Sequence, residues 1–317
     1  MNYIKMSPIV GMSGYGGGAT ALPFSGGSVV KWYGDRACPA GAYNEGTPNQ
    51  IQYFAIANTG NASDFGDLTV GRGGLSGLSD GDRGVYIGDI SITNVMDYIT
   101  IASTGNATDF GNTTTARKGP GCVSDGITGL SGGGNDGGAT AEIDYITIQT
   151  TGNAALFGDL TQARSFLAGA NDATRGVFFA GNDGDDDIDY VTIATAGNAA
   201  VFGESGSNRQ LSACSNEDGR AITMGGWSNY LSTATDMMEY VEIQTTSNTS
   251  DFGDLSEPRR GPAATSNNTR GVCCAGRDDD NNERDIIDYV TISSTGNATD
   301  FGDLLTNTWY LGCTSGA

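Results

Sequence analysis

The chain has 317 residues, and its 37 acidic against 16 basic residues give a formal net charge of −21. Lys and Arg form no cluster that could neutralise a phosphate backbone, and the same charge opposes docking on an anionic membrane surface. Histidine is absent, which removes the commonest general base, the commonest metal ligand and every nucleophile that depends on histidine. We therefore expect no nucleic-acid partner, no membrane insertion and no enzymatic activity.

Glycine and short β-branched stretches dominate the composition. There are 50 Gly and only 7 Pro, while Thr, Ile, Val, Tyr and Phe recur in short bursts. This pattern favours many short strands joined by tight turns over helices. Because only 38% of the residues are hydrophobic, we expect a core built from repeated small contributions.

Residues 1–33 form a glycine-rich N-terminal leader that precedes the repeats described below. They contain neither the apolar core of a secretory signal nor a stretch long enough to span a membrane, so we expect no cleaved signal peptide. Tyr15, Phe24 and Trp32 place adhesive aromatic rings among the glycines. Two interpretations stay open: a loosely packed leader, or an assembly arm that docks on a neighbouring subunit.

Residues 34–317 contain one repeat in six copies, each marked by a Phe-Gly pair. The pairs begin at Phe65, Phe110, Phe157, Phe202, Phe252 and Phe301. Twelve residues before each Phe stands a Tyr, at Tyr53, Tyr98, Tyr145, Tyr190, Tyr240 and Tyr289. Seven residues after it stands an Arg in five copies, at Arg72, Arg117, Arg164, Arg209 and Arg259, and Thr308 takes this place in the sixth. Constant spacing of this kind indicates a repeat architecture.

Each repeat predicts four short strands. The segment 145–148 is β-branched and aromatic, the Thr-Gly-Asn that follows is typical of a turn, and Phe157-Gly158 lies in a second strand, which together make a hairpin. Segments 166–169 and 176–181 make another strand pair upstream. Four antiparallel strands per repeat are one blade, so we predict an all-β, six-bladed β-propeller.

The chain ends predict how the ring closes. Residues 308–314 read as a first strand without a continuation, and the segment beginning at Asp35-Arg36 resembles the second strand at Asp82-Arg83. We therefore expect a composite blade from residues 34–68 and 305–317, which protects edges that would otherwise pair with other molecules. The other blades are predicted at 69–113, 114–160, 161–205, 206–255 and 256–304.

Length variation between the repeats falls before the Tyr strand. The segments 181–189, 225–239 and 276–288 occupy equivalent places and differ in length. Insertions at an equivalent position project from one face of a repeat fold, often the binding face. On this face Trp227 and Tyr230 are candidates for stacking on a sugar ring.

The six cysteines are predicted to be small, buried core residues. Cys122 and Cys214 lie five residues after the repeat Arg and Cys313 five after Thr308, so all three are expected at one repeat position in the first strand. Cys38, Cys273 and Cys274 fall in the second strand. Without a CxxC pair or any histidine, a structural zinc site is not expected.

Two acidic loops are the candidates for a metal. One carries Asp183, Asp185 and Asp187, and the other carries Asp278 and Asp280. Calcium takes six to eight oxygen ligands, which such loops can offer, but neither loop has EF-hand spacing. A solvated acidic loop without any cofactor is the alternative interpretation.

Two further recurring polar residues have structural interpretations. The repeat Arg and the carboxylates before the Tyr, at Asp97, Asp144, Asp189, Glu239 and Asp288, predict buried ion pairs within or between blades rather than a ligand ring. Asn-X-Ser/Thr recurs at Asn61, Asn106, Asn248 and Asn297. Since these lie in the repeated turn, turn geometry explains them better than glycosylation.

The repeated Asp-Tyr-Ile/Val-Thr-Ile, Thr-Gly-Asn-Ala-Thr and Asp-Phe-Gly-Asp-Leu segments, clearest at 97–110 and 288–304, resemble the kelch-like repeat proteins of marine tailed bacteriophages. The resemblance covers residues 35–317. It departs from ordinary kelch repeats, because only Gly225-Gly226 gives a diglycine in the expected context, with 132–134 a looser case. The resemblance implies a virion structural or fibre component. It carries no catalytic implication from copper-containing propellers, whose metal needs histidine.

Three hypotheses follow. The first is a non-catalytic structural and adhesive protein on a virion or other extracellular particle, as an appendage, decoration or fibre subunit, with itself or other virion proteins as partners. The second is a self-polymerising extracellular filament in which residues 1–33 dock on the next propeller. The third is a soluble lectin-like propeller that binds a host surface glycan through the variable face.

Overall fold

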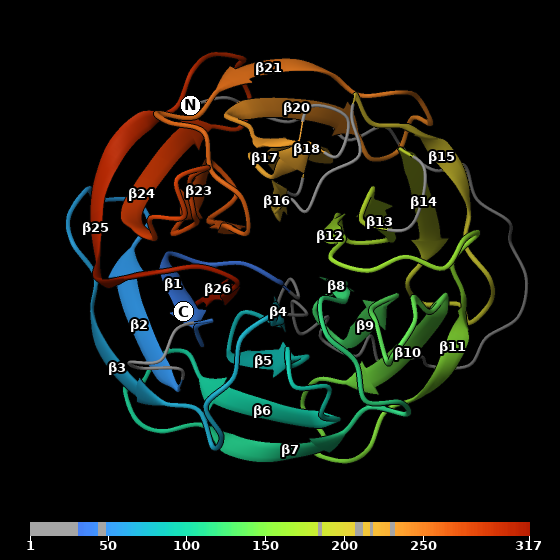
Figure 1. The fold of residues 1–317 in the computed structure, drawn as a ribbon. Coiled ribbons are helices and arrows are strands. Elements are labelled where there is room, and N and C mark those ends of the chain that lie inside the picture. The colour runs from blue at the N-terminus through green and yellow to red at the C-terminus, as the bar shows by residue number, and fades with distance from the viewer. Residues whose placement is uncertain (1–30, 44–48, 183–185, 207–211, 216–217, 229–231) are drawn as a thin grey trace, which may run out of the picture.

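We describe a computed structural model of the chain, which covers residues 31–43, 49–182, 186–206, 212–215, 218–228 and 232–317. These residues form four-stranded antiparallel sheets arranged as six blades around a central axis (Figure 1). The predicted all-β, six-bladed β-propeller is confirmed. Within the described ranges, no helix is long and apolar enough to cross a membrane.

Each blade runs from an innermost strand at the axis to an outermost strand at the rim. The composite blade contains β26 (Gly312–Gly316), β1 (Arg36–Ala40), β2 (Gln50–Ala55) and β3 (Ser63–Asp67). Blade 2 contains β4 (Ser76–Ser79), β5 (Arg83–Ile87), β6 (Val95–Thr100) and β7 (Thr108–Asn112). Blade 3 contains β8 (Gly121–Ser124), β9 (Thr128–Gly132), β10 (Glu142–Thr147) and β11 (Ala155–Asp159).

The remaining blades follow the same order. Blade 4 contains β12 (Ala168–Asn171), β13 (Arg175–Phe179), β14 (Asp187–Thr192) and β15 (Ala200–Glu204). Blade 5 contains β16 (Ser212–Ser215), β17 (Arg220–Met224), β20 (Met237–Glu242) and β21 (Ser250–Asp254), with a small extra hairpin of β18 (Trp227–Ser228) and β19 (Thr233–Ala234). Blade 6 contains β22 (Ala263–Ser266), β23 (Arg270–Cys274), β24 (Arg284–Thr291) and β25 (Thr299–Thr308).

The ring closes where the two chain ends meet. Strand β26 pairs antiparallel with β1, with Thr314 opposite Cys38, and the two lie side by side in the composite blade (Figure 1). The predicted first strand at 308–314 is shifted, because β25 continues to Thr308 and pairs there with Arg284 of the lengthened β24. The inner strand therefore begins at Gly312, and blade 6 extends beyond its predicted end at residue 304.

The core lies between the blades. The buried hydrophobic residues of the described chain gather in six clusters, and each cluster draws on two neighbouring blades. Phe54 of the composite blade, for example, packs with Ile287 and Phe301 of blade 6. This is the pattern expected when a low hydrophobic content is spread over repeated small contacts, since each sheet buries its faces against the next sheet.

The Phe-Gly pair and the Thr-Gly-Asn turn form one clip between neighbouring blades. Gly105, in the turn of blade 2, donates its N–H to the carbonyl of Phe65 in the composite blade (2.8 Å), and Asn106 Oδ1 accepts from the N–H of Asp67 (3.1 Å). A Cβ on Gly66 would lie 2.4 Å from the carbonyl oxygen of Gly105, so the second residue of Phe-Gly must be glycine. The same Asn side-chain contact recurs at Asn61, Asn153, Asn198, Asn248 and Asn297. This contact accounts for the recurring Asn without glycosylation.

Candidate functional site at the insertion face

Four of the repeat arginines form buried ion pairs with the carboxylates that precede the repeat tyrosines, as predicted, and the fifth, Arg209, lies outside the described residues. Arg164 and Asp189 have fully buried side chains with 2.8 Å between Nη2 and Oδ2. The same carboxylate accepts hydrogen bonds from the N–H and hydroxyl of Thr161, in the segment that leads into the blade. Equivalent pairs are Arg72–Asp97 (3.1 Å), Arg117–Asp144 (2.8 Å) and Arg259–Asp288 (2.8 Å). These residues hold the segments between blades and are not exposed as a ligand ring.

The composite blade replaces both partners of this pair with neutral residues. Gln52 stands at the carboxylate position and Thr308 at the arginine position, and both are buried. Gln52 Oε1 accepts the N–H of Leu305 (2.7 Å), so its amide oxygen takes the place of the carboxylate oxygen that accepts the equivalent N–H, for example that of Thr161, in another blade. Replacing both partners avoids a buried, unpaired charge.

A second set of arginines, to which sequence reasoning gave no role, joins neighbouring blades. The guanidinium of Arg83 lies 4.2 Å from the ring centroid of Tyr98 and donates through Nη1 to the carbonyl of Ile148 in the next blade (3.0 Å). The same stacking on a tyrosine and the same hydrogen bond to a carbonyl of the next blade are made by Arg36, Arg175, Arg220 and Arg270. In blade 3 the equivalent residue is Thr128, because it pairs with Thr147 in the same register in which Arg83 pairs with Thr100. The ring of Tyr145, which no arginine of the described chain covers, is 39% exposed. The sequence marks this set of arginines by an Arg-Gly-Val segment that recurs at Arg83, Arg175 and Arg270.

All six cysteines are buried and free, which confirms the core interpretation. Their predicted placement is wrong for Cys214. Cys122 and Cys313 face the second strand at equivalent registers, opposite Ser131 and Pro39, whereas Cys214 lies one residue further along its strand, opposite Ile222. Burial raises the pKa of the Cys122 thiol to about 11 and that of Cys38 to about 12, so neither thiol is a reactive thiolate at neutral pH.

The central channel is encircled by hydrogen bonds from one equivalent residue near the end of each inner strand. Ser79, Ser124, Asn171, Ser215, Ser266 and Ser315 occupy this position, one per blade. The hydroxyl of Ser124 donates to the carbonyl of Ser79 (2.6 Å), and the other serines repeat the contact with the preceding blade. Between blades 3 and 4 the Asn171 side chain instead accepts the N–H of Ser124 (3.0 Å).

The predicted leader residue Trp32 lies at one mouth of this channel. Trp32 and Tyr33 line the cavity there, their rings meet edge to face at 5.4 Å, and the carbonyl of Trp32 accepts from Ser79 (2.8 Å). In the described part of the leader, Trp32 thus packs on its own propeller. Tyr15 and Phe24 lie outside the described residues, and an assembly role for the leader stays a prediction.

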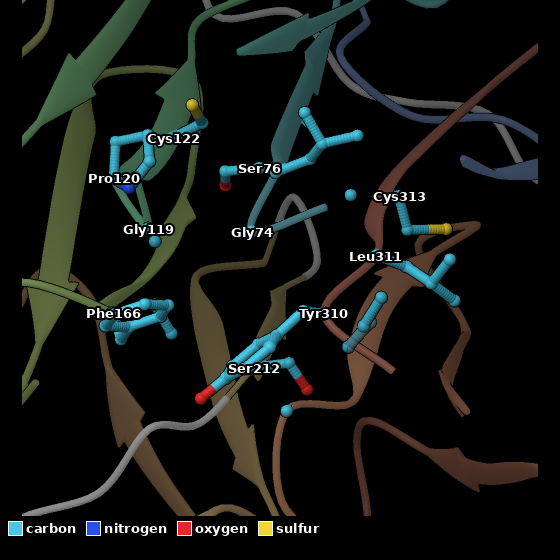
Figure 2. Close-up of a pocket in the computed structure, with 18 of the residues that line it drawn as sticks. Gly74, Ser76, Gly119, Pro120, Cys122, Phe166, Ser212, Tyr310, Leu311 and Cys313 are labelled. Carbon is cyan, nitrogen blue, oxygen red and sulfur yellow. The ribbon is translucent and has the colours of Figure 1, made fainter. Parts of the chain in front are cut away.

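The opposite mouth opens on the face that carries the insertions, and we call it the insertion face. A cavity of about 90 Å³ lies there, lined by the segments that precede the inner strands (Figure 2). Such a volume holds a few water molecules. Two aromatic residues, Phe166 and Tyr310, lie together at its edge with ring centroids 5.1 Å apart.

Phe166 and Tyr310 adopt a backbone conformation that three other blades give to glycine. Both residues lie two positions before an inner strand and have φ of 55° and 56°. At the equivalent position of three other blades, the φ values are 68° for Gly74, 60° for Gly119 and 60° for Gly261. A large side chain in this region costs about 1–3 kcal/mol, and such strain gathers at binding and active sites. Burial raises the pKa of Tyr310 to about 12, and the nearby Arg260 lowers it.

Around this mouth five blades pair one residue of the entry segment with one residue of the insertion, and the entry residue of blade 5 lies outside the described residues. Lys118 pairs with Asn135 in blade 3 and Arg260 with Arg277 in blade 6 through backbone bridges. In the composite blade, Tyr43 donates its N–H to the carbonyl of Trp309 (3.1 Å). Blade 2 contributes Gly73 and Ile90, blade 4 contributes Ser165 and Asn182, and blade 5 contributes Trp227.

Among the described residues, the large aromatic side chains and the arginines of this rim gather in one half of it, while blade 3 contributes the cation Lys118. The aromatic side chains and the arginines come from three consecutive blades, namely 5, 6 and the composite blade. We call Trp227, Arg260, Arg277, Trp309 and Tyr43 the half-rim. Arg260 lies over Trp227 (4.4 Å) and Trp309 (5.7 Å), and Arg277 lies over Trp309 (4.7 Å). The predicted sugar-stacking residue Trp227 belongs to this group, and Tyr230 lies outside the described residues.

The predicted calcium loops are described in part. Asp278 Oδ1 accepts the N–H of Asn282 (2.7 Å), and Oδ2 accepts from Arg284 (2.6 Å) and Asn282 Nδ2 (3.0 Å). These contacts lower the pKa of Asp278, the Asn282 side chain contributing most, and they describe an acidic turn. Asp280 is exposed and Asp187 begins β14.

No group of three or more candidate metal ligands occurs within the described residues. Asp183 and Asp185 lie outside them, so calcium binding at that loop stays a prediction. The loop at Asp279 also has a structural role, because its carboxylate accepts the N–H of Ala234 (2.7 Å) and thereby holds the extra hairpin of blade 5. Calcium binding at Asp278 and Asp280 likewise stays a prediction.

The fold and this rim define the class of protein: a six-bladed β-propeller with one elaborated mouth. No protein-family model matches the chain, and no curated protein matches it either.

Proposed function

We propose that this propeller is a non-catalytic structural and adhesive protein of a virion, and that it binds its target through the insertion face. One observation carries the adhesive part. Residues that recur in the repeat serve the contacts between blades, whereas the half-rim departs from the repeat in three consecutive blades at one mouth. The strained backbone at Phe166 and Tyr310 at that mouth makes the fold less stable, so we attribute it to binding rather than to folding.

The virion part rests on the resemblance of the repeat to marine tailed-phage proteins and on the charge of −21, which keeps densely displayed copies soluble. The test is mass spectrometry of gradient-purified particles from the virus that encodes the chain. Peptides of the propeller should co-sediment with the major capsid protein at a constant molar ratio across the gradient. A chain found only in the soluble lysate would contradict the proposal.

A lectin-like role is the second candidate, and the half-rim favours it because aromatic side chains with neighbouring hydrogen-bond donors are typical of small-molecule sites. It differs from the first proposal in requiring no particle. The two are separated by the same sedimentation experiment.

A further inference from the structure

The half-rim holds its two guanidinium groups in a fixed stack. Arg260 lies over the rings of both Trp227 and Trp309, and Arg277 lies over Trp309. Trp309 is buried, and Tyr310 stacks on it with centroids 4.2 Å apart. Stacking fixes the plane of each guanidinium, so little further ordering is needed when its N–H groups meet a ligand.

Donor groups of both arginines remain available. Arg260 Nη2 donates to Asn281 Oδ1 (3.1 Å) and Arg277 Nε donates to the carbonyl of Asn281 (3.2 Å). Arg260 Nε is buried without a hydrogen-bond partner. A buried donor without a partner is unfavourable, and an acceptor from a ligand that reaches it would remove this cost.

Neither arginine forms an ion pair with a carboxylate of the described chain. The contrast is with Arg284 on the same blade, which is paired with both Glu257 (2.7 Å) and Asp278 (2.6 Å). In a chain of net charge −21, two stacked cations that have no carboxylate partner among the described residues indicate that the anion comes from another molecule.

An exposed aromatic ring lies beside these donors. Tyr43 is 46% exposed and meets Trp309 edge to face, with centroids 5.2 Å apart. Its ring offers an apolar face with a polar tip, which suits the C–H face of a sugar ring better than an extended acidic peptide. The cavity at Phe166 and Tyr310 adjoins the same entry segments and continues the site toward the axis.

We propose that the half-rim binds an anionic polysaccharide. Arg260 and Arg277 take its carboxylate or sulfate group, and a sugar ring lies on Tyr43. This proposal rests on the adhesive function proposed above, for which it names the ligand class.

The experiment measures binding of the full-length protein to immobilised oligogalacturonate, dextran sulfate, neutral dextran and polyglutamate. Binding to at least one of the two anionic polysaccharides is expected, with no binding to dextran and a fall as salt is raised. Preference between oligogalacturonate and dextran sulfate identifies the anionic group as carboxylate or sulfate. Failure to bind either polysaccharide, or equal binding to polyglutamate, would overturn the proposal.

Variants locate the site. Arg260→Gln with Arg277→Gln should weaken binding at least tenfold, and Arg277→Gln alone provides a test if the double variant does not fold. Arg260→Lys with Arg277→Lys keeps the charge but loses the planar donors, so it should bind between wild type and the Gln variant. Lys118→Gln, at the equivalent rim position of blade 3, is the matched control and should bind as wild type. Equal loss in the control would contradict the assignment to the half-rim.

Failure here is distinguishable from failure of the proposed function. A protein that co-sediments with particles but binds none of these polymers contradicts only the ligand class. A protein that binds anionic polysaccharide but is absent from particles contradicts the virion role alone.

Discussion

The hydroxyl of Ser79 donates a 2.6 Å hydrogen bond to the carbonyl of Ser315, which lies 236 residues later in the chain. The hydroxyl of Ser315 donates in turn to the carbonyl of Ser266 in blade 6 (2.7 Å). The strand that closes the ring is therefore held on both sides by the contacts that join the other blades around the channel. The ring of blades is therefore closed by the same serine hydrogen bonds that join the other blades.

The clip between blades can be tested with two glycine substitutions that differ in one respect. Gly66 and Gly105 have similar backbone conformations, with φ of 150° and 156°, but a Cβ meets the Gly105 carbonyl at 2.4 Å in the first case and nothing within 4 Å in the second. Both Gly66→Ala and Gly105→Ala carry the backbone cost of about 1–3 kcal/mol. Gly66→Ala should cost about 1–3 kcal/mol more because of the clash. Urea unfolding measures both, and equal losses would contradict the clip.

The neutral pair in the composite blade predicts strong coupling. Gln52→Asp or Thr308→Arg alone buries a charge without a partner and should lower the free energy of unfolding by about 3–5 kcal/mol. The double variant recreates the ion pair of the other blades and should recover much of that loss. A double-mutant cycle by urea unfolding gives the coupling energy. Additive losses would show that the two positions do not interact.

Much of this fold could be predicted from the sequence because the contacts between blades use the same residues in every repeat. Phe65-Gly66 and Asn106, for example, recur at fixed spacing since each forms one half of a clip. The misplacement of Cys214 has a physical cause: the chain takes six residues from Arg209 to Ser215 but seven from Arg117 to Ser124. Counting from the arginine could not reveal that shortening.

The half-rim could not be predicted, apart from Trp227. Arg260, Arg277 and Tyr43 come from separate segments and share no motif. Only the backbone pairing around the channel mouth shows that they occupy equivalent positions. Phe166 and Tyr310 could not be predicted either. The segments before the inner strands share no motif that shows that these two residues stand where other blades have glycine.

Blade 3 offers a stabilising substitution. Thr128 occupies the position at which five other blades place an arginine, so Thr128→Arg should cover the exposed ring of Tyr145 and reach the carbonyl of Ile193. A cation–π contact and a hydrogen bond together predict a gain of about 1–2 kcal/mol. Thermal unfolding measures the gain. Thr128→Lys, which lacks the planar guanidinium, is the control and should gain less; a loss of stability in the Arg variant would contradict the role given to this arginine set.

The buried thiols predict a fall in stability at alkaline pH. Burial raises the pKa of Cys122 and Cys273 to about 11, whereas an unfolded cysteine has a pKa of about 8.5. Above pH 8.5 the unfolded state ionises its thiols and the folded state does not, so this contribution to stability is complete below pH 8.5 and declines as pH rises toward 11. Each such thiol should account for about 2 kcal/mol at pH 10.

Urea unfolding at pH 7.5 and pH 10 measures this decline, and Cys122→Ala should reduce it relative to wild type. A thiol reagent at pH 8 should label the native protein hardly at all and all six cysteines after unfolding. Rapid labelling of the native protein would contradict the burial of these residues.

In the proposed role, a virion displays this propeller with its insertion face outward. Immunogold electron microscopy of intact purified particles tests it with two antibodies, one raised against the loop at residues 277–283 on the insertion face and one against the turn at residues 103–105 on the opposite face. We expect the first antibody to label intact particles and the second to label them much less. Absence of label from both, with both antibodies binding the free protein, or a preference for the second antibody, would contradict it.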